Sequence, residues 1–539
     1  MMKICSQCGE SFEVFHEDIE LYEKVSPVYD GKKYLIPVPE ICPHCRFIQK
    51  ATFRNEHTYY RTKSSFSGKP LISVYAPDRS YKVFSYDEWW SDKWDALDYS
   101  RDFDFGRGSF EQFAELFLEV PKINLIQDGT SENCEYTNFG AENKNCYLTL
   151  GLRAEDVYYS IDAMMSKDCV DCLHIVSSEK LYECVSCEQC FNCSYLNRCN
   201  QCVDSYFLES CISCNNCLGC KNLRHKQFWI FNQPYSESEY FERLKGYELN
   251  THEGILKFKK EYENFKLKLP CLFATQKLSE NSTGEFLDGA KDCHMCYLVL
   301  MGAENCRYSF VIGRKCKDII DCNNTDGELN CFADGAMASQ RILFSHFIRN
   351  CSEISYSMFC YNCQHLFLCT GLSRKQYCIL NKQYSKEEYE KLVPKIIEHM
   401  QKTGEWGKYF PLKMSAFGYN ETFAYDMWPL SEEKALKLGF RWSSYKQDAE
   451  ISGDDYVICE VTGRPFKLIK QEIEFYKKHE IPFPKIHPNV RIEQRYKIRN
   501  PNEFWERNCA QCGGKIVTTY DPKRPEIVYC EKCYLDEVY

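Results

Sequence analysis

Cysteines recur at a period of three residues through the middle of this chain. The region from 124 to 383 holds 26 of the 35 cysteines. In its first half, twelve cysteines are separated by multiples of three: Cys169, Cys172, Cys184, Cys187, Cys190, Cys193, Cys199, Cys202, Cys211, Cys214, Cys217 and Cys220. Side chains share a face every 3.6 residues on a helix and every two on a strand, so a period of three fits neither. It favours a narrow β-solenoid, in which short strands turn corners and small side chains point inward.

These central cysteines have four interpretations. Cysteine is small, apolar and readily buried, so the thiols can simply fill a narrow core. The run Cys211, Cys214, Cys217 and Cys220 is similar to an iron–sulfur motif, although it lacks the final Cys-Pro and the longer last gap. Additional zinc and redox disulfides are the other two alternatives. Core packing is favoured, because the period extends well beyond four ligands.

Paired C-x2-C motifs near each end of the chain have the spacing of zinc ribbons. The N-terminal set is Cys5, Cys8, Cys42 and Cys45, and the C-terminal set is Cys509, Cys512, Cys530 and Cys533. Zn²⁺ prefers four thiolates in a tetrahedron, and two such knuckles supply them. Neither set leaves a coordination position open for substrate. The sequence therefore predicts two structural Zn²⁺ ions per chain and no catalytic metal.

The two ends are copies of one module that held two sites in tandem. Asp18-Ile-Glu-Leu-Tyr matches Glu472-Ile-Glu-Phe-Tyr, and Arg54-Asn matches Arg499-Asn. The second site of the N-terminal copy reads Ser64, Ser67, Ser85 and Glu88 in place of cysteines. The first site of the C-terminal copy reads Cys459, Thr462, His487 and Val490. These are poor ligand sets, so we expect both altered sites to lack zinc and to survive on packing alone.

The expected fold class is mainly β with helical linkers, in which zinc-ribbon modules flank two cysteine-laddered β-solenoid halves. A serine followed by acidic residues predicts helix starts at Ser236, for a helix to about residue 266, and at Ser385. Ser109 is expected to cap another helix. The predicted units are residues 1–95 (N-terminal zinc-ribbon module), 96–123 (helical linker), 124–233 (first solenoid half), 234–270 (helical connector), 271–383 (second solenoid half), 384–454 (helical and irregular linker) and 455–539 (C-terminal zinc-ribbon module).

Composition and charge indicate where the protein is located and which partners are disfavoured. The chain opens with MMKICSQCGE and shows no apolar signal segment or transmembrane stretch. A reducing, cytoplasmic location is therefore expected, and there paired cysteines bind metal or stay as thiols. The net charge of -10 argues against bulk electrostatic binding to nucleic acid.

Two short segments are basic despite the acidic whole, and both carry interleaved aromatic residues. They span residues 42–63 and 485–524, each after the first zinc position of its module. A zinc ribbon beside such a segment favours association with RNA or the ribosome. The alternative is a solvated charged face with buried aromatic rings. The predicted contact residues are Arg46, Lys50, Arg54, Arg61, Arg491, Arg495, Lys497, Arg499 and Arg507.

No motif for catalysis is present: the chain has no P-loop, no dinucleotide-binding glycine fingerprint, no H-E-x-x-H and no nucleophile elbow. The sequence thus predicts a non-enzymatic zinc-binding protein that acts as a binding module, most specifically for RNA or the ribosome. Two alternatives stay open. One is a protein-interaction or self-assembling scaffold without nucleic acid, and the other is a thiol-based protein of metal handling or redox chemistry.

The chain also resembles a known family. Phe53-Arg-Asn-Glu, Tyr75-Ala-Pro-Asp-Arg, Lys144-Asn-Cys-Tyr-Leu, Lys167-Asp-Cys-Val-Asp-Cys and Asn381-Lys-Gln-Tyr-Ser carry the resemblance. They resemble uncharacterised cysteine-rich zinc-ribbon proteins of small-genome candidate-phyla bacteria. The resemblance spans nearly the whole chain and implies a cytoplasmic bacterial protein. It also implies cysteines in the second N-terminal ribbon, from which this chain departs.

Overall fold

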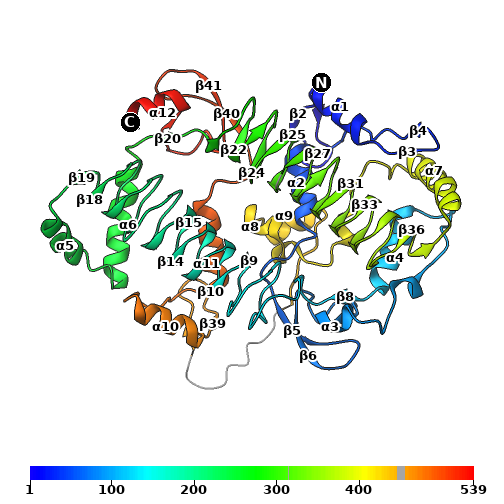
Figure 1. The fold of residues 1–539 in the computed structure, drawn as a ribbon, viewed down its shortest axis with the longest axis horizontal. Helices are drawn as coiled ribbons and strands as arrows, with labels where there is room; N and C mark the ends of the chain where they lie inside the picture. Colours follow the sequence, from blue (N-terminus) through cyan, green and yellow to red (C-terminus); the bar gives the residue numbers. More distant parts are fainter. Residues whose placement is uncertain (314, 446–455) are drawn as a thin grey trace.

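Two ladders of parallel strands fill the middle of the molecule (Figure 1). The computed structural model describes residues 1–313, 315–445 and 456–539. The first ladder consists of β9 (Gly151–Leu152), β10 (Glu155–Tyr158), β11 (Ile161–Met164), β12 (Lys167–Val170), β13 (Leu173–Val176), β14 (Glu179–Tyr182), β15 (Val185–Glu188), β16 (Phe191–Ser194), β17 (Asn215–Leu218) and β18 (Gln227–Ile230). The second ladder consists of β21 (Gln276–Lys277), β22 (Gly284–Asp288), β23 (Ala290–Lys291), β24 (Cys296–Val299), β25 (Ala303–Arg307), β26 (Phe310–Ile312), β27 (Cys316–Ile320), β28 (Asn323–Thr325), β29 (Gly327–Glu328), β30 (Asp334–Met337), β31 (Ser339–Leu343), β32 (His346–Arg349), β33 (Ser352–Ser355), β34 (Met358–Tyr361), β35 (Gln364–Phe367) and β36 (Gln376–Ile379).

A constant register explains the period of three. Strands of the first ladder pair in parallel twelve residues apart, as Glu155 does with Lys167 and Ile161 with Leu173. Between Arg153 and Asn216 the backbone takes a positive φ at every third residue. Each twelve-residue rung therefore has four bends, and one residue beside each bend points inward. The strand-rich, parallel arrangement agrees with the expected fold class, although no sheet closes on itself among the described residues.

The inward residues are small because the interior of a rung is narrow. The thiols of Cys172, Cys202 and Cys217 have no solvent exposure, and every ladder cysteine is free. The Cys202 thiol lies 3.5 Å from the carbonyl oxygens of Asn200 and Cys211, and its one hydrogen can be donated to either. A thiol at this position thus meets backbone acceptors of its own rung and of the next. This burial fits the simplest interpretation of the central cysteines, which is core packing.

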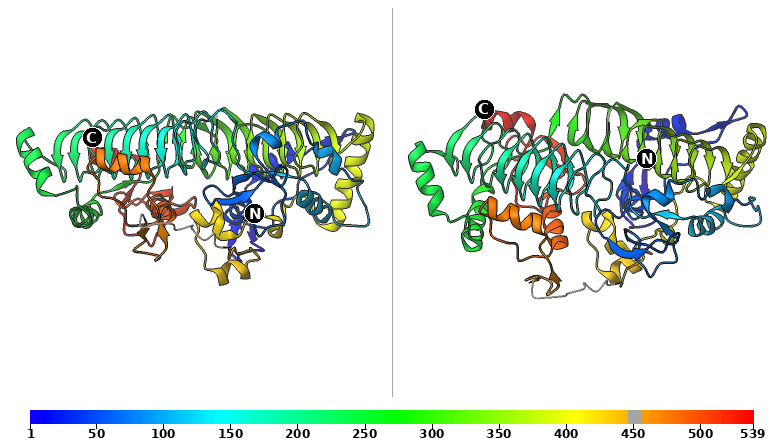
Figure 2. Two further views of the ribbon diagram at one scale, coloured as in Figure 1. Left: turned by 90° about the horizontal axis from the view of Figure 1, so that it is seen from below. Right: turned by 60° about the horizontal axis from the view of Figure 1, so that its bottom comes forward.

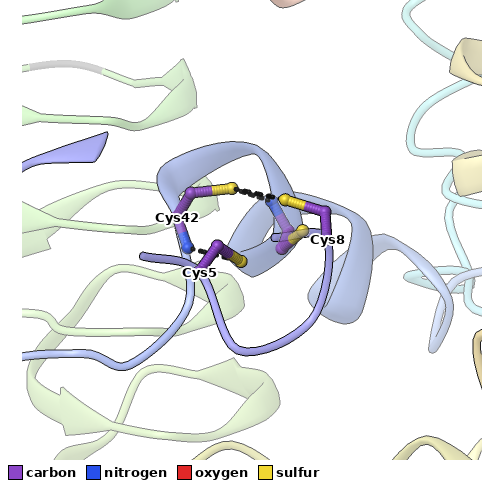
Figure 3. A group of neighbouring side chains, drawn as sticks. Cys5, Cys8 and Cys42 are labelled. Carbon is purple, nitrogen blue, oxygen red and sulfur yellow. Dashed lines mark hydrogen bonds between the residues drawn. The ribbon is translucent and has the colours of Figure 1, made fainter. Parts of the chain in front are cut away.

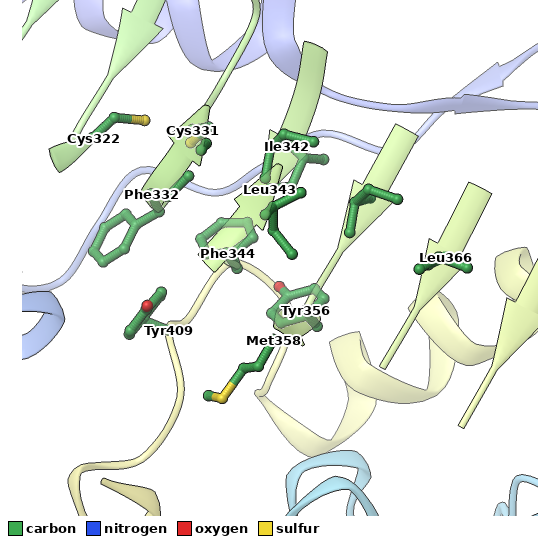
Figure 4. Packing of buried hydrophobic residues seen from close by; sticks show 14 of the residues in the cluster. Cys322, Cys331, Phe332, Ile342, Leu343, Phe344, Tyr356, Met358, Leu366 and Tyr409 are labelled. Atoms are coloured by element: carbon green, nitrogen blue, oxygen red, sulfur yellow. The ribbon is translucent and has the colours of Figure 1, made fainter. Parts of the chain in front are cut away.

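Large residues cover the outside of the second ladder where other segments pack on it (Figure 4). Phe332, Phe344 and Tyr356 lie on successive rungs, with ring centroids 5.6 and 5.0 Å apart. Tyr409 from the segment after the ladder packs on Phe332. The stack gives a buried aromatic interface between the ladder and the chain that follows it.

Helices lie between and beside the ladders. Capping boxes at Ser236 with Glu239, and at Ser385 with Glu388, confirm the two predicted helix starts. The predicted helix from 236 to about 266 is two helices, separated at residues 247–251. Ser109 is the first helical residue rather than the cap, and the Glu405 carboxylate accepts the free N–H groups of Ser109 and Phe110. The helices are α1 (His16–Val25), α2 (Pro43–Ala51), α3 (Tyr86–Trp89), α4 (Ser109–Glu119), α5 (Glu237–Gly246), α6 (His252–Lys266), α7 (Lys386–Thr403), α8 (Phe423–Met427), α9 (Glu432–Lys437), α10 (Lys470–Lys478), α11 (Pro488–Ile498) and α12 (Glu531–Val538).

Short hairpins and bridging strands complete the structure. Two of the parallel pairs, β7 with β8 and β20 with β42, join a module to the segment before a ladder. In the part of the chain that the structure describes, no helix is long and apolar enough to cross a membrane. The short strands are β1 (Met2–Ile4), β2 (Ser11–Glu13), β3 (Val28–Tyr29), β4 (Lys32–Lys33), β5 (Tyr60–Lys63), β6 (Pro70–Ser73), β7 (Val83–Phe84), β8 (Lys122–Ile123), β19 (Gln233–Pro234), β20 (Cys271–Leu272), β37 (Lys382–Gln383), β38 (Val457–Ile458), β39 (Pro465–Phe466), β40 (Trp505–Asn508), β41 (Lys515–Thr518) and β42 (Val528–Tyr529).

The two ladders lie side by side and run in opposite directions from the middle of the molecule (Figure 1). Phe139 stacks on Phe347 with centroids 5.2 Å apart, and Arg198 donates to Glu285 at 2.9 Å. Most helices and short sheets lie on one side of this pair, and the opposite edge of both ladders is uncovered (Figure 2). The ladders therefore provide a long frame with one covered and one open side.

Candidate metal centres and docking sites

The four N-terminal cysteines converge as the spacing predicts (Figure 3). Their Sγ atoms lie within 4.8 Å of one another, and those of Cys8 and Cys42 are 3.8 Å apart. A tetrahedral ion with metal–sulfur bonds of about 2.3 Å requires edges of about 3.8 Å. The Cys42 N–H also donates to the Cys5 thiol at 3.3 Å. Four thiols at this spacing fit a single metal ion, which all four residues would hold.

The C-terminal cysteines form an equivalent but more open site. Their Sγ atoms again lie within 4.8 Å, and Cys512 and Cys530 are 3.8 Å apart. Cys530 begins α12, and its N–H donates to the Cys509 thiol at 3.2 Å. Three of the four N-terminal cysteines are buried, whereas only Cys509 is buried here. The C-terminal ion would therefore be the one more accessible to chelators.

Local hydrogen bonds favour the thiolate form of one cysteine in each site. A hydrogen bond from the Cys45 thiol lowers the pKa of Cys42 to about 5. Burial raises the pKa of Cys509, but the N–H groups of Cys512 and Cys530 outweigh it and lower that pKa to about 6. Burial raises the pKa of Cys8 to about 11, and a hydrogen bond with the Cys530 thiol raises the pKa of Cys533 to about 12. Thiolate is the form that binds metal, so Cys42 and Cys509 are the thiols that ionise first in their sites.

All four ribbon positions of the duplicated module keep the same knuckle turn. A glycine follows the first ligand position by four residues, and its N–H donates to the carbonyl of that position at 2.9–3.0 Å. Each of these glycines has a positive φ between 67° and 81°, which costs little without a Cβ. They are Gly9, Gly68, Gly463 and Gly513. The turn is therefore also present at the two altered sites, where the set of four cysteines is not complete.

Hydrogen bonds hold the altered N-terminal site together. The Ser64 hydroxyl donates to the Glu88 carboxylate at 2.5 Å and accepts the N–H groups of Phe66 and Ser67. The Ser85 N–H donates to the same carboxylate at 2.9 Å. The expectation that packing alone preserves this fold is wrong, because a carboxylate–hydroxyl network occupies the place of a metal.

The altered site should loosen in acid. Burial raises the pKa of Glu88, but hydrogen bonds from Ser64, Ser67 and Ser85 lower it from an ordinary 4.5 to about 2. Ionised Glu88 therefore stabilises this ribbon above about pH 4.5, and the contribution is lost as the pH falls toward 2. We expect the fluorescence of the adjacent Trp89 to report this transition. The transition should be absent from the Glu88→Gln variant. A transition of unchanged amplitude in that variant would contradict the role of ionised Glu88.

The altered C-terminal site keeps the knuckle but not the ligands. The His487 N–H donates to the Cys459 thiol at 3.2 Å, as Cys42 does to Cys5. Thr462 lies on an exposed turn, and Val490 is in the first turn of α11. Cys459 with His487 supplies only two ligands, so this position does not belong with the two four-cysteine sites.

The predicted nucleic-acid residues of the N-terminal segment are buried. Arg46 is 2 % exposed, and its guanidinium donates to Asp321 at 2.8 Å. Lys50 lies over the Phe332 ring, and burial lowers its pKa to about 8. Arg54 is held by Glu56 at 2.5 Å and lies over Phe139. The expectation of an exposed basic surface is wrong for these three residues.

The C-terminal copies are buried in the same way. Arg491 and Arg495 are each 3 % exposed and both donate to Asp171 of the first ladder, Arg495 at 2.8 Å. Arg499 lies over the rings of Tyr297 and Phe310. The basic surface expected here is again wrong, because ladder carboxylates and aromatic rings cover the charges.

The other three predicted residues are at the surface or partly covered. Arg61 is exposed on β5, and Lys497 is exposed near the end of α11. Arg507 is half-buried and donates to the carbonyls of Tyr520, Asp521 and Glu526. These three residues therefore differ in exposure from the six buried ones, and the nine predicted residues do not form one basic surface.

The six buried cations instead lie at two equivalent contacts between a terminal module and a ladder, which we call docking sites. The N-terminal module contacts the second ladder, and the C-terminal module contacts the first. In the N-terminal site, Tyr22 and Arg46 meet Asp321, and Asp18 meets Arg307. In the C-terminal site, Arg491 and Arg495 meet Asp171, and Tyr159 donates to Glu472 at 2.8 Å. The acceptors Asp171 and Asp321 could be recognised in the sequence, because they lie in two matching segments. These are Lys167-Asp-Cys-Val-Asp-Cys and Lys317-Asp-Ile-Ile-Asp-Cys.

Comparison of the chain with protein-family models, with curated proteins and with solved structures finds no match.

Proposed function

We propose that this protein is a metal-stabilised, non-enzymatic scaffold that binds other proteins. The two four-cysteine sites hold Zn²⁺, because four thiolates at tetrahedral spacing are the ligand set of structural zinc. The ladders are the two solenoid halves expected from the cysteine period. The many free thiols suit a reducing cytoplasm, where disulfides are rare.

The observation that carries the proposal is a set of exposed apolar side chains on the ladders. Met165 is 50 % exposed, Met301 60 % and Leu278 84 %, and Leu152 and Met337 are also exposed. All five lie in or just after strands of two ladder sheets, and Leu152 and Met165 are on neighbouring rungs. Methionine packs against varied shapes, so these exposed side chains offer apolar contacts to a protein partner.

RNA binding has less support. Six of the nine residues predicted to contact it are buried in ion pairs or against aromatic rings. The basic-aromatic pattern that suggested RNA is the pattern of two internal docking sites. Protein binding needs no basic surface, so it is the function that the exposed residues favour.

The test is retention of partners by the full chain with nuclease present. We expect nuclease-resistant protein partners to be retained by the wild type and lost from Met165→Lys with Met301→Lys. Leu436→Lys is the matched control, because Leu436 is 53 % exposed on α9, outside the ladders. Partners that are released by nuclease, or that bind both variants equally, would contradict the proposal.

A further inference from the structure

A cavity of about 460 Å³ separates the start of the second ladder from the C-terminal ribbon. Gln276, Ser282 and Thr283 of the first rung line one wall. Strand β41 lines the other wall, and the first turn of α12 closes one side. The Thr518 hydroxyl donates to the Phe273 carbonyl at 2.6 Å and joins the two walls at one end. The opening between the first rung and β41 is called the slot here.

Each wall of this slot includes a strand that has one edge unpaired among the described strands. Among the described strands, β21 is the terminal strand of an eight-stranded sheet, and β41 pairs only with β40. In any strand, part of the backbone N–H and C=O groups points to each side, so an edge presents a row of these groups without a ladder partner. Such an edge is a template for a further strand, and the slot has one on either side.

The rim of the slot is basic and its floor is apolar. Lys515 is exposed on the β41 wall and Lys532 on the side that α12 closes. Cys530 of the C-terminal metal centre also lines this side, and Glu531 is the single acidic residue of the lining. Ile516 is buried and Phe273 is half-buried beneath them. An extended segment would thus find backbone partners on both sides, apolar contact below and positive charge at the mouth.

We propose that this slot binds an extended acidic segment of a partner protein by adding it as a β-strand. The inference rests on the protein-binding function proposed above and specifies the form of one partner. Main-chain hydrogen bonds to the two edges would supply affinity, and the lysines would select acidic residues. The mode differs from docking on the exposed methionines, which needs no extended segment.

The experiment uses the zinc-loaded full chain and a fluorescein-labelled nonapeptide of alternating Glu and Thr. Threonine favours extended chain, and glutamate supplies the charge. A second probe replaces each Thr with Pro, which keeps the charge but removes alternate N–H donors. Fluorescence anisotropy measures both affinities at low and at physiological salt. We expect at least a tenfold weaker affinity for the proline probe.

The matched variants separate the slot from general electrostatics. Lys515→Glu with Lys532→Glu should weaken the Glu-Thr probe at least tenfold, whereas Lys434→Glu with Lys437→Glu on α9 should not change it. Equal affinity for the two probes would overturn strand addition, and insensitivity to the slot reversal would overturn the site. If the probe does not bind while the methionine-dependent partners are retained, the slot inference fails and the scaffold function stands.

Discussion

Asp171→Ala should release the C-terminal module from the first ladder. The Asp171 carboxylate has no solvent exposure and accepts hydrogen bonds from both Arg491 and Arg495. Its removal leaves two guanidinium groups buried with only part of their counter-charge. Removal of one partner from a buried ion pair costs about 3–5 kcal/mol. We expect hydrogen exchange by mass spectrometry to show lost protection in α10, α11 and the first ladder.

The control for this prediction is an exposed ion pair on the same ladder. Glu142 pairs with Arg153 at 2.9 Å, and both side chains are about half exposed. Such pairs contribute only about 0–1 kcal/mol, so Glu142→Ala should leave the exchange pattern unchanged. Asp321→Ala should reproduce the effect at the N-terminal module, since Arg46 and Tyr22 meet that carboxylate. Equal effects of Asp171→Ala and Glu142→Ala would contradict the docking role.

Loss of one metal ligand should unfold one ribbon and remove one ion. Structural zinc contributes about 10–16 kcal/mol to the folding of isolated zinc-finger peptides, so a ribbon this small needs its ion. We expect elemental analysis to give two zinc ions per chain in the wild type, one in Cys8→Ala and one in Cys512→Ala. Proteolysis should then cut the affected module only.

Release kinetics provide a second readout of the same centres. A colorimetric chelator should take the C-terminal ion first, because Cys512 is exposed and Cys530 and Cys533 are partly exposed. Cys217→Ala in the first ladder is the control, and it should retain both ions. Metal content above two per chain that falls in Cys217→Ala would show that the ladder thiols also bind metal.

The metal centres could be predicted because their geometry is local. Two C-x2-C turns fix two thiols each, and only the meeting of two turns depends on the fold. The ladder could be predicted for a similar reason, since a bend at every third residue places Cys169 and Cys172 in equivalent inward positions. The hydrogen-bond network at Ser64 and Glu88 could not be predicted, because the absence of a cysteine does not indicate which hydrogen bonds form in its place.

The failure at Arg46 and Arg491 has a physical cause. Whether a guanidinium is exposed depends on which remote carboxylate the fold brings to it, and these partners lie 275 and 320 residues away. Basic residues interleaved with aromatic residues are found both in buried cation–aromatic contacts and on RNA-binding faces, so the pattern alone does not distinguish the two. The matching segments Lys167-Asp-Cys-Val-Asp-Cys and Lys317-Asp-Ile-Ile-Asp-Cys, which contain Asp171 and Asp321, were the signal that distinguishes the two.

The crossed docking of the modules sets an order for assembly on the ribosome. Asp171 is translated 320 residues before Arg491, and Arg46 is translated 275 residues before Asp321. At about 5–20 residues per second, each half of these contacts waits roughly 15–60 s for its partner. During that interval Tyr159 and the first-ladder face that α10 and α11 later cover are open to solvent. A nascent chain of this protein therefore presents a sheet surface that the finished protein covers, and a holding chaperone can bind that surface during this interval.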